Sequence, residues 1–242
     1  MSNIAVIIGA SSAIAAGLIE QLDKDNSVDQ IVAVSRNSLP VYSQSHNKIV
    51  FFMSDYTEES MAHICSEMLA LDGVITHLII CNGILHNERV KPEKKLEDIS
   101  AQFFHEVVHA NTVIPMLWLA KFAPLLKSDC NCRVAILSAR VGSIEDNKSG
   151  GWYAYRASKA ALNMMIKTAS IELQRRAQNV ALIAYHPGTI DTDLSKPFQK
   201  NVVDEKLFTP EFTAKKLLAL MSTLTPKDVA KHYSWDSEII PW

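Results

Sequence analysis

The chain has 242 residues, of which 48% are hydrophobic and 21% are charged, and its formal net charge is −2 at pH 7. This composition is typical of a globular protein, and it favours neither a nucleic acid nor an anionic membrane surface as a partner. Because chains of this size often form one α/β domain, we expect residues 1–242 to be a single domain.

The chain begins with the stretch MSNIAVIIGASSAIAAGLIE, which is as apolar as a secretory signal peptide. A signal peptide normally starts with positive charge, which this stretch lacks, and Gly9-Ala10-Ser11-Ser12 interrupts the apolar run where a turn would fall. We therefore expect a buried strand over residues 4–8, then a turn and a helix. Elsewhere there is no run of roughly 18 apolar residues, so we expect no membrane span.

Short apolar runs recur along the chain and are nearly continuous rather than alternating, which indicates parallel strands that are covered on both faces. After the first, they cover residues 30–35, 48–53, 77–81, 133–138 and 180–185. Stretches with helical spacing lie at residues 58–71, 99–126, 153–177 and about 210–222. This alternation predicts an α/β fold, a single Rossmann-type doubly wound parallel sheet with helices on both faces.

Ligands of such a sheet bind beyond the carboxyl ends of its strands. The small-residue turn after the first strand leads into a helix N-terminus, which favours a phosphate. After the second strand comes Ser35-Arg36-Asn37. An acidic side chain there suits the ribose of NAD, whereas an arginine suits a 2′-phosphate, so the sequence favours NADP(H) over NAD(H). The alternative is that Arg36 is an ordinary solvated charge.

The stretch FFHEVVHAN, residues 103–111, contains the His-Glu-x-x-His pattern of zinc proteases. The extended form of that pattern fails, because Thr112 and Pro115 stand where glycine and the last histidine should be. No later segment offers a clear third ligand. We therefore expect no metal site and interpret this stretch as the helix that carries Asn111.

Ser138 ends the fifth expected strand, and the segment YAYRASKAALNMM follows with Tyr155 and Lys159. A spacing of four places the phenol and the ammonium on one face of a helix. An adjacent cation can lower the pKa of a phenol by about 1 to 3 units from its usual value near 10. We therefore expect Tyr155 to be a usable acid near neutral pH.

These features occur in the order and rough spacing of the short-chain dehydrogenase/reductase family, which the chain resembles over essentially its whole length. The resemblance rests on the turn after the first strand and on Asn111, Ser138, Tyr155 and Lys159, with further matches at Asp55 and in the segment PGTIDT. More narrowly, ILSARVGSI, WYAYRASKAALNMM and the terminal IPW resemble the branch related to the bacterial cell-to-cell signalling C-factor.

The resemblance implies an oxidoreductase that interconverts a carbonyl and an alcohol by hydride transfer. Tyr155 would be the proton donor, and Lys159 would lower its pKa and hold the nicotinamide ribose. Ser138 would donate a hydrogen bond to the substrate oxygen. Asn111 would position a water that links Lys159 to solvent.

The resemblance also implies a cofactor site along the carboxyl edge of the sheet, with Asp55 near the adenine and the loop after the sixth strand closing on the nicotinamide. The residues expected in this site are Gly9, Ser11, Ser12, Ala13, Ile14, Ser35, Arg36, Asn37, Asp55, Tyr56, Asn82, Gly83, Tyr155, Lys159, Pro187, Gly188, Ile190 and Thr192. The walls of the substrate pocket are expected from Ile84, Leu85, Val141, Trp152 and residues 193–200.

Two motifs depart from the family pattern. The turn Thr-Gly-x-x-x-Gly-Ile-Gly has alanine at two of its glycine positions, Ala13 and Ala15. A Cβ at Ala13 is expected to crowd the pyrophosphate or to require a φ that alanine tolerates less well than glycine. The family's Asn-Asn-Ala-Gly also becomes Ile80-Cys81-Asn82-Gly83. Both changes bear on cofactor affinity.

A second hypothesis is a cofactor-binding regulatory or signalling protein with little turnover, which the two alanines and the C-factor resemblance favour. A third, nucleotide-sugar epimerase or dehydratase chemistry, shares the Tyr-x-x-x-Lys pair, but this chain leaves little material for the substrate domain of those enzymes.

The expected partner is a small-molecule carbonyl or alcohol. The resemblance also implies a homo-oligomer, a dimer or tetramer, paired through the long helices near residues 100–126 and 153–177. The four cysteines show no disulfide pattern, which indicates free thiols in a reducing cytoplasm.

Overall fold

A computed structural model describes residues 1–38, 48–87, 91–201, 203, 206–227 and 229–242 of the chain. Its central sheet has eight strands in the order β10-β9-β6-β5-β4-β1-β2-β3. The strands are β1 (Ser2–Ile8), β2 (Gln30–Ser35), β3 (Ile49–Met53), β4 (Gly73–Ile80), β5 (Cys132–Leu137), β6 (Val180–His186), β9 (His232–Ser234) and β10 (Ile239–Ile240). All neighbours pair in parallel except β10, which runs antiparallel to β9.

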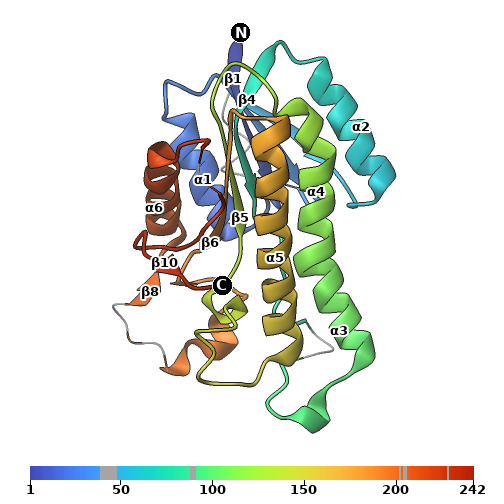
Figure 1. Cartoon of the computed structure of the whole chain (residues 1–242), viewed down its shortest axis with the longest axis vertical. Helices are drawn as coiled ribbons and strands as arrows, with labels where there is room; N and C mark the ends of the chain where they lie inside the picture. Colours follow the sequence, from blue (N-terminus) through green and yellow to red (C-terminus); the bar gives the residue numbers. More distant parts are fainter. Residues whose placement is uncertain (39–47, 88–90, 202, 204–205, 228) are drawn as a thin grey trace.

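Helices cover both faces of the sheet (Figure 1). One face carries α1 (Ala13–Asp23) and α6 (Pro210–Thr223), and the other carries α2 (Glu58–Leu69), α4 (Ile114–Phe122) and α5 (Tyr153–Arg176). The remaining elements are α3 (Ala101–Val108), the π-helical turn η3 (His109–Val113), a small sheet of β7 (Thr189–Ile190) with β8 (Leu207–Phe208), and the 3-10 turns η2 (Leu96–Asp98), η4 (Ala123–Leu125), η5 (Arg140–Gly142) and η6 (Lys196–Asn201).

The continuous apolar character of the strands follows from this layering. Along β1, Ile4 and Ile8 enter the core under α2, α4 and α5, whereas Ala5 and Ile7 enter the core under α1 and α6. Because both faces of the strand are buried, successive residues of the strand are apolar whichever face they point to. The expected α/β fold with a mostly parallel doubly wound sheet is therefore confirmed.

The structure differs from the sequence-based expectation in two places. The stretch expected as one helix over residues 99–126 is divided into α3, η3, α4 and η4. The tail contains β9 and β10, which extend the sheet beyond β6 although no strand was expected there. Strands of three and two residues are too short to show a periodicity in the sequence.

The strand order reverses between β1 and β4, and the turn after β1 lies directly against the end of β4. Gly9 has φ +81°, and a Cβ built on it would lie 3.2 Å from the carbonyl carbon of Cys81. Glycine at this position therefore allows both the left-handed backbone and the close approach. This is the point in a doubly wound sheet where a ligand crevice forms.

Candidate active site

Two cavities lie at the carboxyl edge of the sheet and share Asn82 and Gly83 in their walls. The first has a volume of about 650 Å³ and is lined by residues that include Arg36, Asp55 and Tyr56. The second has a volume of about 570 Å³ and runs from the N-terminus of α1 to the start of α5. Together they form an elongated crevice of a size that suits a dinucleotide.

The first cavity carries the arginine that follows β2. The Arg36 guanidinium carbon lies 5.5 Å from the centroid of the Tyr56 ring. Asp55 accepts hydrogen bonds from the Thr57 N–H at 3.0 Å and the Thr57 hydroxyl at 2.8 Å. These bonds hold the pKa of Asp55 below its usual value, with the backbone bond as the larger cause. An exposed cation stacked on an aromatic ring is thus placed where an anionic group of a ligand would enter.

The N-terminus of α1 faces the second cavity. Ser12 caps the helix, because its hydroxyl oxygen accepts the Ala15 N–H at 3.3 Å. Ala13 and Ala15 lie inside the helix, and neither has positive φ. The expectation that alanine at position 13 would need an unfavourable φ is therefore wrong, since helical backbone suits alanine. The Ala13 side chain is exposed and lines the cavity.

Lys159 is buried at the base of the second cavity, with 3% of its surface exposed. Its ammonium donates to the Leu137 carbonyl oxygen at 2.9 Å, and burial lowers the pKa of Lys159 to about 8. A Cβ built on Gly83 would lie 3.5 Å from Nζ of Lys159 and 3.2 Å from Oδ1 of Asn111. Glycine at position 83 thus keeps the space in front of the ammonium open.

Tyr155 lines the same cavity, but its titration differs from the expectation. Burial raises the pKa of Tyr155 to about 12. The net lowering expected from Lys159 is therefore wrong, because desolvation of the phenol outweighs the effect of an ammonium whose Nζ lies 6.0 Å from the ring centroid. The side chain keeps its proton through neutral pH, and in the free protein it is a weaker acid than the spacing predicted.

Ser138 stands at the end of β5 and lines the second cavity. Its hydroxyl donates to Oδ1 of Asn163 at 2.6 Å, and both side chains are buried. The only hydroxyl hydrogen of Ser138 is therefore directed at Asn163, whereas the expected function was donation to a substrate oxygen. Nδ2 of Asn163 is buried and has no hydrogen-bond partner.

Asn111 lies in the π-helical turn η3, which the sequence did not predict. Its Oδ1 accepts the Ile84 N–H at 2.7 Å, and its Nδ2 donates to the Ile84 carbonyl at 2.9 Å and to the Ser158 hydroxyl at 3.1 Å. The side chain therefore ties the loop after β4 to α5. That Asn111 positions a water remains a prediction.

The crevice gathers most, though not all, of the residues expected to bind the cofactor. Those that line it are Ser11, Ser12, Ala13, Ile14, Arg36, Asp55, Tyr56, Asn82, Gly83, Tyr155, Lys159, Pro187 and Thr192. Those that do not line either cavity are Gly9, Ser35, Asn37, Gly188 and Ile190. Gly188, with φ +84°, instead lines a third cavity of about 490 Å³ beside Phe208 and Trp235. The Ser35 hydroxyl turns inward and donates to the Asn37 carbonyl.

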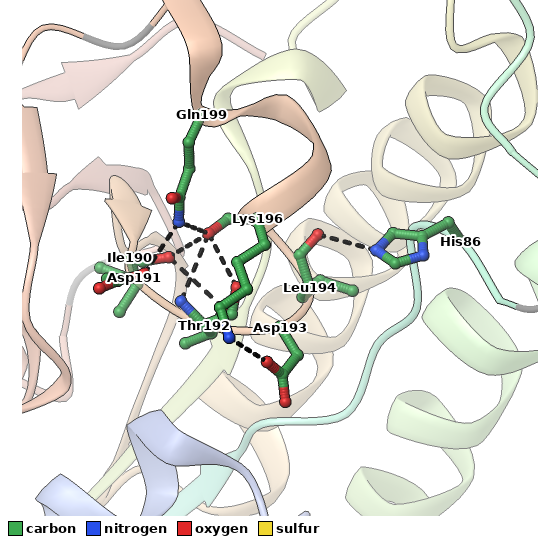
Figure 2. Close-up of polar contacts among 9 residues, drawn as sticks. His86, Ile190, Asp191, Thr192, Asp193, Leu194, Lys196 and Gln199 are labelled. Atoms are coloured by element: carbon green, nitrogen blue, oxygen red, sulfur yellow. Dashed lines mark hydrogen bonds and ion pairs between the residues drawn. The ribbon is translucent and has the colours of Figure 1, made fainter.

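The loop that follows β6 lines the second cavity and is held by internal bonds (Figure 2). Gln199 donates to Asp191 at 3.1 Å, and Lys196 pairs with Asp193 at 2.9 Å. Across the crevice, the His86 ring lies 3.1 Å from the carbonyl oxygen of Leu194. Of the expected substrate walls, Ile84 lines the first cavity and Asp193, Leu194 and Lys196 line the second, whereas Leu85 is buried. Val141 and Trp152 line neither of these two cavities, so the expectation for them is not met.

The His-Glu-x-x-His stretch spans the end of α3 and the first residue of η3. His105 and His109 are exposed, and Glu106 accepts a hydrogen bond from Asn87 at 2.6 Å. Among the residues that the structure describes, no three His, Cys, Asp or Glu side chains are grouped to hold a metal ion. Nor is any helix in those parts of the chain long and apolar enough to cross a bilayer.

Four residues that shape the site went unnoticed in the sequence. His86 contacts the loop after β6, and Glu93 contacts the start of α5. Gly142 packs against Lys159, and Asn163 bonds to Ser138. Of these four residues, only Gly142 could have been noticed in the sequence, because it is an isolated glycine just after the fifth expected strand. The other three contacts join segments that are far apart in the chain, so no local pattern marks them.

Comparison with known proteins gives matches in sequence and in fold. The family model described as short chain dehydrogenase matches residues 3–202. A 1-hydroxy-2-glutathionyl-2-methyl-3-butene dehydrogenase from Rhodococcus sp. is 35% identical over 56% of this chain and 57% of its own length, so the match spans little more than half of that relative. The C-signal of Myxococcus xanthus is 31% identical over 54% of this chain and 74% of its own.

Among solved structures, an NADPH-bound carbonyl reductase from chicken fatty liver has a TM-score of 0.84 to this chain. The two chains are 22% identical, and the similarity covers 100% of each. At this level of identity the likeness is one of fold, and it matches the mostly parallel sheet flanked by helices.

Proposed function

The chain belongs to the short-chain dehydrogenase family, and from this premise we propose that it interconverts a small-molecule carbonyl and an alcohol with NADP(H), using Tyr155 as the proton donor. As a member of this family it is an oxidoreductase of the class that binds a nicotinamide cofactor. The observation that carries the proposal is that the cavity holding Tyr155 and Lys159 adjoins the cavity beside Arg36.

The residues present fit the cofactor. Arg36 offers a cation for a 2′-phosphate, and the N-terminus of α1 offers backbone N–H groups for a pyrophosphate. Oδ1 of Asn82 is buried between the two cavities without a hydrogen-bond partner, which supports a ligand that donates to it there. When bound, the nicotinamide supplies or accepts the hydride.

In reduction, negative charge develops on the substrate oxygen, and that oxygen needs a proton from a nearby acid. Tyr155 holds its proton at neutral pH, because burial raises its pKa to about 12. Lys159, with a pKa of about 8, is mostly protonated at pH 7 and favours the phenolate that remains after the proton has moved. Its further N–H groups are oriented by the bond to Leu137 and are suited to the ribose.

The test is consumption of NADPH and of NADH by the purified protein with a panel of aldehydes, ketones and diketones. We expect reduction of at least one panel member, with NADPH preferred because of Arg36. Failure to bind either dinucleotide contradicts the proposal. A clear preference for NADH contradicts only the part that concerns Arg36.

A second candidate is a cofactor-binding regulator with little turnover, which the similarity to the Myxococcus C-signal favours. Tight NADPH binding without reduction of any panel member supports this candidate. Against it, the four side chains expected for catalysis are all present and three of them line one cavity.

We further propose that residues 1–242 form one dinucleotide-binding oxidoreductase domain, which limited proteolysis that yields no stable fragment would support. A homo-oligomer, dimer or tetramer, is proposed through α4 and α5, where a mostly apolar groove includes Met116, Leu119 and Ala169. Light scattering measures that state directly. Four cysteines without disulfides support a reducing cytoplasm as the location, which fluorescent tagging in cells tests.

A further inference from the structure

Three aromatic side chains from separate segments meet beside Tyr155. Phe198, on the loop after β6, lies 4.9 Å from Trp152 and 5.6 Å from His86 between ring centroids, both edge to face. Trp152 in turn lies 6.1 Å from the Tyr155 ring. The proposed proton donor is therefore one end of a chain of aromatic contacts that runs through Trp152 to the loop after β6.

Trp152 is held in an unusual backbone conformation at this place. It has φ 54° and ψ 46°, in the left-handed region, immediately before α5. Its N–H donates to the Glu93 carbonyl at 2.6 Å, while the buried Glu93 carboxylate accepts the Ala154 N–H at 3.2 and 3.3 Å. Left-handed backbone at a bulky residue persists only where its surroundings impose it, and such residues gather at ligand sites. Glu93 thus fixes the direction of the indole.

His86, on the loop after β4, meets the loop that carries Phe198 at the Leu194 carbonyl (Figure 2), and its ring also contacts the Phe198 ring. Within this loop Lys196 pairs with Asp193, and the Phe198 ring contacts the Trp152 ring. An uncharged flat ring is the ligand chemistry that matches these two rings.

We infer, on the basis of the proposed function, that the site takes carbonyl compounds in which the carbonyl is attached to an aromatic ring. The ring packs beside the Trp152–Phe198 pair, and its carbonyl oxygen faces Tyr155. Each edge-to-face or offset contact of this kind favours an aromatic over a saturated ring by about threefold to tenfold.

The experiment uses matched pairs in which only the ring differs: acetophenone with cyclohexyl methyl ketone, benzaldehyde with cyclohexanecarbaldehyde, and the corresponding 1,2-diketones. For each pair, the ratio of kcat/KM is measured for the wild type, Phe198→Leu and Phe212→Leu. Because intrinsic reactivity is the same for every variant, only changes in the ratio count. Phe212 is the control, since it makes a similar stacked contact with Phe208 outside the crevice.

Phe198→Leu is expected to lower the aryl-over-cyclohexyl ratio by about threefold to tenfold, mainly through KM, while Phe212→Leu leaves it unchanged. An unchanged ratio in Phe198→Leu overturns the inference, as does reduction only of carbonyls that carry no ring. Failure to reduce any carbonyl is a different result, because it overturns the proposed function and the inference with it.

A second inference rests on a separate observation, the contact between Ser138 and Asn163. As oriented, the amide accepts the only hydrogen of the Ser138 hydroxyl and leaves its own buried Nδ2 unpaired. Rotating the amide by a half turn lets Nδ2 donate to Ser138 and frees the hydroxyl hydrogen for a substrate oxygen. The rotated form leaves Oδ1 as the unpaired amide atom, but it offers the hydroxyl hydrogen to a substrate oxygen, so a bound substrate favours the rotated form.

On the same proposed function, we propose that Asn163 is a positioning residue whose amide decides whether Ser138 donates to the substrate. Asn163→Asp has almost the same shape but can only accept when ionised, so it should hold the hydroxyl hydrogen away from the substrate. We expect kcat to fall by roughly a hundredfold, as for the loss of one donor to a developing oxyanion. Asn163→Ala releases the hydroxyl, and its loss should be within about tenfold.

The pH profile and a double-mutant cycle separate this function from a packing function. Activity of Asn163→Asp should recover as pH falls through the pKa of the new carboxyl, because the protonated acid can donate to Ser138. In a Ser138→Ala background, Asn163→Asp should cost under about threefold more. A larger loss for Ala than for Asp, or full additivity with Ser138→Ala, overturns the proposal. If Asn163→Asp does not fold, additivity is measured with Asn163→Ala instead, and full additivity with Ser138→Ala overturns the proposal.

Discussion

The two cavities of the crevice hold their polar groups in opposite surroundings. Arg36 and Asp55 in the first are exposed, and their partners are a ring face and a local turn. In the second, Lys159 and Ser138 are only 3% and 4% exposed. Exposed charges recognise a ligand weakly and are screened by salt, whereas desolvated groups have shifted pKa values and act strongly. On the proposed function, the first cavity selects the cofactor and the second moves the proton.

The largest expected effect comes from Lys159→Met, a substitution in the second cavity. We expect kcat to fall by at least about a hundredfold, because the phenolate of Tyr155 loses its neighbouring cation. Stability should rise or stay level, since burial lowers the pKa of Lys159 to about 8 from the model-peptide value of 10.5, which corresponds to roughly 3 kcal/mol against the charged form. Thermal unfolding and steady-state kinetics together check this.

The size of that stability effect depends on pH. The folded protein holds the Lys159 proton less firmly than the unfolded chain, so the penalty is complete below about pH 8 and diminishes as pH rises toward 10.5. The stability gain of Lys159→Met should therefore shrink between pH 7 and pH 10. A variant that is less stable than the wild type at pH 7 contradicts the account of a desolvated ammonium.

The pH dependence of reduction sharpens the same contrast. Above about pH 8 the Lys159 ammonium deprotonates, while Tyr155, with a pKa of about 12, keeps its proton. We expect kcat for reduction to fall by up to roughly tenfold per pH unit above that point. Lys159→Arg, which stays charged, should remove this alkaline fall even where its overall rate is low. A flat profile from pH 7 to 10 in the wild type contradicts the assignment.

Gly142→Ala probes the packing behind the second cavity. A Cβ there would lie 2.7 Å from Cβ of Lys159, so we expect a loss of about 1 to 3 kcal/mol in the free energy of unfolding and a lower kcat. Gly150→Ala is the control, because its Cβ meets nothing within 4 Å although its φ is +64°. The control should lose about 1 kcal/mol from backbone strain and keep its kcat. Equal kcat values for both variants would indicate that η5 does not hold Lys159.

The smallest expected effect concerns the first cavity. Arg36→Leu should raise KM for NADPH by about fivefold to tenfold, leave KM for NADH nearly unchanged, and leave kcat intact. Because Arg36 is exposed, added salt should reduce the difference between wild type and variant. The control is Lys24→Leu. Lys24 is an exposed cation outside the crevice, and its Nζ lies 2.6 Å from Oε1 of Glu20. This substitution should leave the KM for NADPH and the KM for NADH unchanged.

The sequence predicted the features that are local or periodic. The apolar runs marked all six principal strands, although β4 begins at Gly73 rather than at residue 77. The spacing of Tyr155 and Lys159 predicted a shared helix face, and both line one cavity. The sequence could not predict the π-helical turn at Asn111 or the Ser138–Asn163 contact, because both depend on how distant segments pack. The pKa of Tyr155 was predicted in the wrong direction because the spacing gives no measure of desolvation.

The most direct test of the central claim compares cofactor binding with turnover in Tyr155→Phe. The claim is that the exposed cavity holds NADPH while the buried one supplies the proton. Fluorescence titration should therefore give a Kd for NADPH within about threefold of the wild type, while NADPH oxidation with the best carbonyl of the panel falls by at least about a hundredfold. Turnover that persists at the wild-type rate in Tyr155→Phe would contradict the account.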